Sequence, residues 1–189
     1  MQNIQIKDFG IARNGVEILQ YTLQNRNGMK LEFINLGGII TKLTAPDRNG
    51  NYEDVVLGYA DPKVYLSNPW YFGAIIGRFG NRIANASFSI DDEVFQIENN
   101  EGENSLHSGN NGFHNVIWDV NIIEDSIEPK VQLSYVSEDG EGGFPGTLRT
   151  EVNYSLTKEN ELKIEYKATT DKATIVNLTH HSYYNLSGN

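Results

Sequence analysis

The chain has no cysteine and few basic residues, and each shortage excludes a kind of site. Without cysteine there are no disulfides, no thiolate metal ligands and no cysteine nucleophile. The 15 Lys and Arg against 25 Asp and Glu give a formal charge of −10. Nucleic acid and anionic membranes are poor partners for such a surface, because Lys and Arg drive binding to both. A neutral or cationic small ligand is compatible with it.

Long apolar runs are also missing. No stretch approaches the length of a membrane span, and residues 1–8 contain no apolar signal core. We therefore expect a cytoplasmic protein with no membrane partner. With 189 residues, of which 39% are hydrophobic, the chain can still bury a substantial core.

Helical periodicity is nearly absent, and strand patterns take its place. One short helical turn is expected at Asp61 and Pro62. Residues 16–23 and 29–35 flank an Asn-Arg-Asn-Gly turn that favours a hairpin, and residues 147–170 alternate apolar and polar over two long strands. Further strands are expected at 39–43, 88–90, 94–97, 118–122 and 131–136. Roughly ten strands without βαβ alternation predict an all-β sandwich of antiparallel sheets.

Residues 173–188 are expected to form a strand with an unusually polar face. Alternation places four polar side chains on one face: Asn177, Thr179, His181 and Tyr183. The other face receives Val176, Leu178, His180 and Ser182. An amide, a hydroxyl, an imidazole and a phenol together suit a cleft that binds a polyhydroxylated ligand and supplies a proton near neutral pH. We favour His181 over His180 because Asn177 and Tyr183 share its face.

Two earlier segments could contribute donors to such a cleft. Residues 77–82 place Arg78, Asn81 and Arg82 among glycines, where donors for sugar hydroxyls and ordinary surface ion pairs are both possible. The polar loops 99–115 and 137–146 are of the kind that carries binding groups. The first of them contains His107, which is either an ordinary loop residue or catalytic, and His114, which we interpret as structural.

Other chemistries match the sequence poorly. The separated histidines lack the closely spaced third ligand of a usual metal site. There is no Gly-x-Ser-x-Gly nucleophile motif, no phosphate loop, and the glycine-rich residues 140–146 precede a strand instead of a helix. We therefore predict no metal and no cofactor.

Five segments taken together resemble the aldose 1-epimerase (galactose mutarotase) family. They are residues 72–84, 104–109, 112–118, 143–146 and 176–186, and they follow one another in the family's order. The resemblance implies an antiparallel β-supersandwich that interconverts the α and β anomers of free aldoses by acid and base catalysis, with an aldose sugar as its small-molecule partner.

The family's motifs also imply roles for individual residues. His181 matches the general acid that protonates the ring oxygen, and His107 matches a second histidine near the anomeric centre. The implied sugar contacts are Asn81, Arg82 and Tyr183. Two positions depart from the family pattern, which usually has Asn in place of His180 and Phe in place of Tyr184.

In the family, the general-base glutamate and a substrate-binding aspartate come later than any residue of this chain. We therefore expect residues 1–189 to be the N-terminal portion of a single mutarotase-like domain, truncated and inactive alone. Open sheet edges would favour a homodimer. Two alternatives stay open: a non-catalytic carbohydrate-binding protein of the same fold, and a hexose-6-phosphate 1-epimerase, which would need a cationic cluster.

Overall fold

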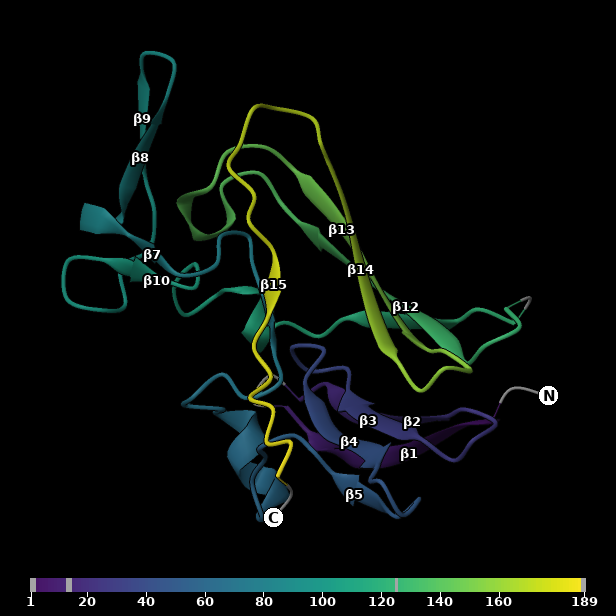
Figure 1. Ribbon diagram of the computed structural model, residues 1–189. Coiled ribbons are helices and arrows are strands. Elements are labelled where there is room, and N and C mark those ends of the chain that lie inside the picture. Colours follow the sequence, from purple (N-terminus) through teal and green to yellow (C-terminus); the bar gives the residue numbers. More distant parts are fainter. Residues whose placement is uncertain (1–2, 13–14, 125, 188–189) are drawn as a thin grey trace.

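The computed structural model describes residues 3–12, 15–124 and 126–187, and most of its regular structure is antiparallel sheet (Figure 1). The first large sheet has the order β1-β2-β3-β4-β5. Its strands are β1 (Asn3–Ile11), β2 (Glu17–Gln24), β3 (Lys30–Ile34), β4 (Ile40–Pro46) and β5 (Tyr52–Asp54). The predicted first hairpin is confirmed: β2 pairs with β3, and Asn25 Oδ1 accepts the Met29 N–H at 2.9 Å across the turn.

The second large sheet has the order β11-β12-β13-β14. Its strands are β11 (Asp119–Ile122), β12 (Lys130–Ser137), β13 (Leu148–Leu156) and β14 (Leu162–Thr170). On β13 the apolar face is buried as the alternation predicts, but the matching residues of β14 are half-buried and Ala168 is exposed. β14 is an edge strand of this sheet, so its apolar side chains have fewer neighbours.

The two sheets pack face to face around a shared core, which confirms the all-β sandwich (Figure 1). Phe33 of β3 stacks on Tyr21 at 5.1 Å and meets the ring of Tyr154, on β13, edge-on at 5.3 Å. The Tyr154 hydroxyl donates to the Gly38 carbonyl at 2.8 Å, so this buried phenol is satisfied inside the core.

Short elements connect the sheets. The predicted helical turn is η1 (Pro62–Leu66), where Asp61 caps the Lys63 N–H at 2.9 Å. The remaining elements are β6 (Ile75–Ile76), β7 (Arg82–Ile83), η2 (Ala84–Ala86), β8 (Ser87–Ile90), β9 (Glu93–Gln96), β10 (Ser105–Leu106), η3 (Phe113–Asn115), η4 (Glu141–Gly143) and β15 (Thr179–His180).

β8 and β9 form the predicted second hairpin, which projects from the body of the molecule (Figure 1). Within the described residues, no helix has the length and apolar character needed to cross a membrane.

The prediction of a long strand over residues 173–188 was wrong, because only β15 pairs as a strand among the described residues. The segment is extended and bridges Phe79 through Asn177 and Val56 through Tyr184. Residues 74–80 run beside this segment: the His181 N–H donates to the Ala74 carbonyl, and the Gly80 N–H donates to the Asn177 carbonyl. Between these bonds only Ile75 and Ile76 pair with it as a strand, so the ladder is short, although the alternation of side chains survives.

Candidate active site

A cavity of about 980 Å³ opens beside β15 and collects the five residues that the sequence singled out. Its wall consists of residues 69–71, residues 80–82, residues 177–183 and the side chains of Glu101, Leu106 and His107. His107, His181, Asn81, Arg82 and Tyr183 all lie on this wall. Segments far apart in the sequence therefore meet at one place, where β15 pairs with β6 and β10 pairs with β7.

The two imidazoles converge within the cavity. The ring centroids of His107 and His181 are 5.1 Å apart and their planes are nearly perpendicular, at 89°. Tyr71 lies beside both, with its ring centroid 4.8 Å from His107 and 5.8 Å from His181. Since both rings line the open cavity, both could touch one bound ligand.

Hydrogen bonds to Asn81 fix the proton on the His107 ring. The backbone of His107 has a φ of +54°, and its backbone N–H donates to the Asn81 carbonyl at 3.0 Å. The Asn81 N–H in turn donates to His107 Nδ1 at 3.0 Å, so the proton of the neutral ring is on Nε2. Burial, aided by His181 and Arg82, lowers the pKa of His107 to about 4. At neutral pH this imidazole is therefore a hydrogen-bond donor and not a cation.

Arg82 is held at the edge of the cavity by Glu101. Its Nε and Nη2 each contact one carboxylate oxygen of Glu101 at 2.6 Å, while Nη1 donates to Asn81 Oδ1 at 3.3 Å. The hydrogen bond with Arg82 lowers the pKa of Glu101, and the same bond raises that of Arg82. The bidentate contact uses one edge of the guanidinium and leaves further N–H donors for a ligand.

The C-terminal segment turns neighbouring histidines in opposite directions, as its alternation predicts. The ring of His181 lies 5.2 Å from that of Tyr183, on the cavity side. The ring of His180 instead meets Tyr154 of the core edge-on at 6.1 Å. Burial lowers the pKa of His180 to about 4, against the opposing effect of a hydrogen bond with the Gly73 backbone.

Comparison with known proteins identifies the family. A family model described as aldose 1-epimerase matches residues 19–189. The chain belongs to the aldose 1-epimerase family. It is 41% identical over 180 residues to galactose mutarotase from Sus scrofa, covering 95% of this chain and 51% of that protein. It is 36% identical over 178 residues to aldose 1-epimerase from Escherichia coli K12, covering 94% of this chain and 51% of that protein.

The solved structures agree with the observed fold. The crystal structure of galactose 1-epimerase from Lactobacillus acidophilus NCFM has a TM-score of 0.87 at 28% identity, covering 98% of this chain and 54% of that one. The aldose epimerase homologue from C. elegans gives 0.79 at 29% identity, covering 100% and 52%. The β-supersandwich expected from the resemblance is confirmed. The chain spans about half the length of the curated relatives it matches.

Arg78 does not line the histidine cavity, although the sequence grouped it with Asn81 and Arg82 as a possible donor. Neither reading made there, a sugar donor or a surface ion pair, was right, because the side chain is only 2% exposed. It donates to Ser137 Oγ and to four backbone carbonyls, at distances from 2.9 to 3.1 Å. These acceptors all lie in residues 137–146, so Arg78 holds this loop together. The loop supplies no wall to the histidine cavity.

The side chains of the cavity that the sequence did not single out include Trp70, Tyr71 and Glu101. Tyr71 touches a third imidazole, His114, whose ring centroid is 4.8 Å away and which is buried, in keeping with a structural role. Burial lowers the pKa of His114 to about 4. For Trp70 and Tyr71 the available signal was the run of three aromatic residues, 70–72, just before the glycine-rich segment 73–80. No group of three His, Asp or Glu side chains in the described ranges is placed to hold a metal ion.

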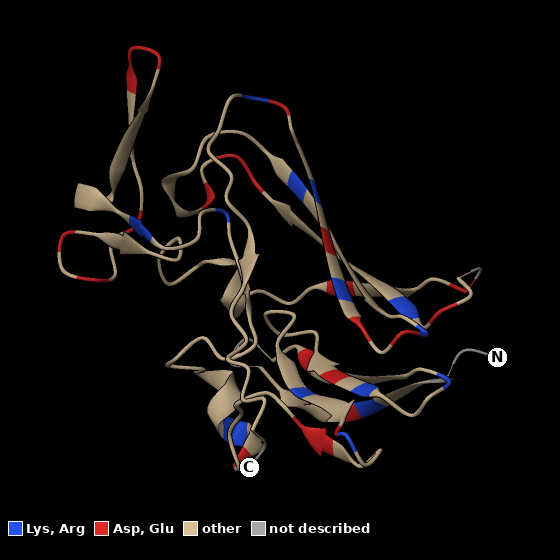
Figure 2. Cartoon of the chain, viewed as in Figure 1, with Lys and Arg blue, Asp and Glu red and all other residues tan. Residues whose placement is uncertain are grey.

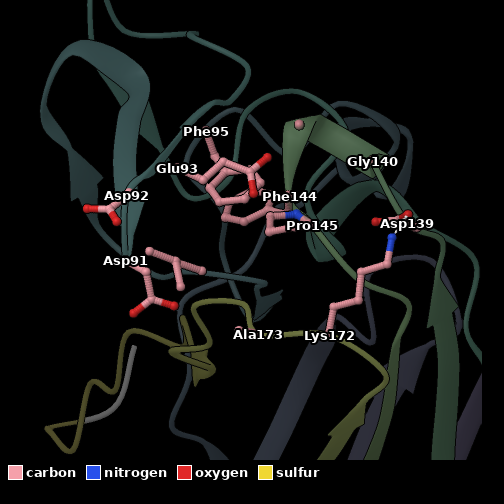
Figure 3. Close-up of a pocket in the computed structure, with 12 residues that line it drawn as sticks. Asp91, Asp92, Glu93, Phe95, Asp139, Gly140, Phe144, Pro145, Lys172 and Ala173 are labelled. Atoms are coloured by element: carbon pink, nitrogen blue, oxygen red, sulfur yellow. Dashed lines mark hydrogen bonds and ion pairs between the residues drawn. The ribbon is translucent and has the colours of Figure 1, made fainter.

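A second cavity, of about 750 Å³, lies between the β8–β9 hairpin and residues 139–145 (Figure 3). Its lining combines Phe95 and Phe144 with the acidic residues of the hairpin tip, which is coloured red in Figure 2. Lys172 forms an ion pair with Asp139 at its edge. Its described lining contains no histidine, so the histidine cavity is the better candidate for acid and base chemistry.

Proposed function

We propose that the protein is an aldose 1-epimerase that interconverts the α and β anomers of free aldohexoses in the histidine cavity. The observation that carries this proposal is the approach of His107 and His181, with ring centroids 5.1 Å apart, beside the donors of Asn81 and Arg82. The names of the relatives, galactose mutarotase and aldose 1-epimerase, support the same reaction.

The reaction requires proton transfers at two oxygen atoms of the sugar. A base takes the proton of the anomeric hydroxyl while an acid protonates the ring oxygen, and the ring opens to the aldehyde. Rotation about the C1–C2 bond and reclosure give the other anomer. We assign the acid to His181, and the Nε2–H of His107 to a hydrogen bond near the ring oxygen. A positioned acid and base each contribute about 10²–10⁴-fold.

The base is assigned to no residue of this chain. Among the described residues, Glu101 is the carboxylate on the wall of the cavity, and both of its oxygens contact Arg82. Because this contact lowers its pKa, Glu101 is a poor proton acceptor. The family resemblance implies a glutamate base and an aspartate that come later than residue 189. That residues 1–189 are the N-terminal portion of a longer domain stays a prediction.

Polarimetry tests the proposal directly. Fresh α-glucose or α-galactose should mutarotate faster with the full-length protein than in buffer alone, whereas residues 1–189 should add little to the spontaneous rate. Heat-inactivated protein is the control. If the full-length protein gives only the buffer rate, the epimerase proposal fails. Full activity in residues 1–189 would show that the base lies within them.

The unassigned base keeps a second function open, namely sugar binding without turnover. Calorimetric binding of galactose with no rate enhancement would favour it. A hexose 6-phosphate substrate fits less well, since Arg82 already contacts Glu101 and Arg78 is buried among its own acceptors. Competition between galactose and its 6-phosphate distinguishes the two. A cytoplasmic location and a homodimer stay predictions, the latter testable by light scattering.

A further inference from the structure

Trp70 is a large apolar side chain left exposed at the histidine cavity. It is 66% exposed and lines the cavity wall, whereas the chain's other tryptophan, Trp118, is 1% exposed in the core. A single exposed apolar side chain is ordinary on a protein surface. Trp70 differs from such a residue in two respects: it lies on the cavity wall, and hydrogen bonds fix its backbone.

Hydrogen bonds from both sides fix the loop that carries Trp70. The Tyr59 hydroxyl donates to Asn68 Oδ1 at 3.0 Å and accepts the Trp70 N–H at 3.4 Å. Asn68 is buried, and its Nδ2 donates to the Phe72 carbonyl at 3.0 Å, while its own carbonyl accepts the Tyr71 N–H at 2.9 Å. The backbone of Trp70 is therefore fixed before any ligand arrives, which lowers the entropic cost of using its side chain in binding.

Trp70 and Tyr71, the first two of three consecutive aromatic residues, have different surroundings. Tyr71, with a φ of +57°, places its ring against three imidazoles, while the side chain of Trp70 remains largely in solvent. Tyr183, 45% exposed, is a second exposed aromatic residue on the same wall. The cavity therefore combines an interior of polar donors with exposed aromatic surface.

A pyranose ring likewise has both polar groups and apolar surface. Its hydroxyls require donors and acceptors such as those of Asn81 and Arg82, and its axial C–H groups form apolar patches that are best covered by a flat aromatic ring. We propose that Trp70 is a substrate-binding residue whose indole packs against the C–H face of the bound aldose. This inference rests on the proposed function for the identity of the ligand.

Trp70 acts on binding and not on the proton transfers, because its described contacts do not include the imidazole pair. An interaction made equally with the substrate and the transition state changes KM and leaves kcat unaltered. Trp70→Ala should therefore raise KM for galactose about tenfold, in line with aromatic packing of ordinary strength. Trp70→Phe should recover part of the loss, since a smaller aromatic ring remains.

Intrinsic fluorescence gives a readout that does not depend on turnover. Galactose should change the tryptophan emission of the full-length wild-type protein, and this change should be much smaller in Trp70→Phe. The difference between the two proteins is the part of the signal that comes from Trp70 and from no other tryptophan. Ile127→Ala is the matched control, since Ile127 is 87% exposed and lies outside the cavity wall. Its fluorescence response and KM should equal those of wild type.

The outcomes separate this inference from the proposed function. Normal mutarotation with an unchanged KM in Trp70→Ala, and no Trp70-dependent fluorescence change, overturns the role of Trp70 and leaves the epimerase intact. A Trp70-dependent fluorescence change without mutarotation supports the role of Trp70 and overturns the epimerase. If galactose and glucose neither bind nor mutarotate, both proposals fail.

Discussion

The chain uses the same residue types in two regions, a buried polar layer and the wall of the histidine cavity. The buried layer contains the side chains of Arg78 and His114, together with the ring of His180, which packs against Tyr154 although residue 180 also borders the cavity. The cavity wall contains Arg82, His107 and His181. The members of each pair are near one another in sequence: two arginines four positions apart in one segment, two histidines in one loop, and two adjacent histidines. Residue type alone therefore does not decide the role.

The difference lies in where the polar groups find partners. Arg78 directs its guanidinium at acceptors of the 137–146 loop, whereas Arg82 contacts one carboxylate and keeps donors at the cavity edge. Arg78 makes its hydrogen bonds within the protein, so they contribute to stability, whereas Nδ1 of His114 and Nε2 of His180 are buried without a partner among the described residues. A group on a cavity wall can keep bonding capacity for a ligand. Substitutions in the buried layer should therefore lower stability, and substitutions on the wall should lower activity.

The largest expected effect is on the buried arginine. Arg78→Met removes every donor to Ser137 and to the four carbonyls, and leaves those acceptors without partners. We expect the free energy of unfolding to fall by about 3–5 kcal/mol, as when one partner of a buried charged contact is removed. Urea denaturation measures it. Arg149→Met, at an exposed arginine of β13, is the control and should have little effect. Equal midpoints for the two variants would contradict the role given to Arg78.

The next largest effect concerns the adjacent histidines. His181→Asn in the full-length protein should lower kcat at least about a hundredfold, because the acid that we propose for protonation of the ring oxygen is lost. His180→Asn should lower it much less, since that ring faces Tyr154. Polarimetry at saturating sugar compares them. Similar losses of kcat in both variants would contradict the different roles given to His180 and His181.

Protonation of His180 should make stability depend on pH. Its folded pKa of about 4 lies below the usual value near 6.5, so the unfolded chain binds the proton more readily. The stability gained from keeping His180 neutral is complete above pH 6.5 and is lost as the pH falls through 4, by about 3 kcal/mol in all. Urea denaturation between pH 7 and 4 should show a shallower decline for His180→Asn than for wild type. Equal slopes would mean that the pKa of His180 is the same in the folded and the unfolded chain.

Much of this arrangement could be predicted from local patterns. Alternation located β2, β3, β13 and the opposite orientation of His180 and His181, because side-chain direction along extended chain depends on local geometry. The motifs of the family brought His107 and His181 to one site. The burial of Arg78 was not predictable, since its five acceptors come from a loop about sixty positions later. The prediction of a long strand over residues 173–188 also failed, because the pairing of this segment depends on the backbone path of residues 73–81.

The smallest expected effect tests whether the cavity wall is itself organised by charge. Glu101→Gln keeps the shape of the side chain but removes the charge that fixes the Arg82 guanidinium. Because this ion pair is exposed, its loss should leave stability nearly unchanged. A freely rotating Arg82 would bind sugar less well, so KM should rise a few-fold while kcat is retained.

The effect of Glu101→Gln should shrink as salt is added, since screening already weakens the wild-type ion pair. The matched control is Glu151→Gln, which removes an ion pair with Lys167 between β13 and β14, away from the cavity. It should leave KM unaltered at every salt concentration. If Glu101→Gln does the same, Arg82 is oriented by Asn81 alone, and the wall depends on hydrogen bonds as the buried layer does.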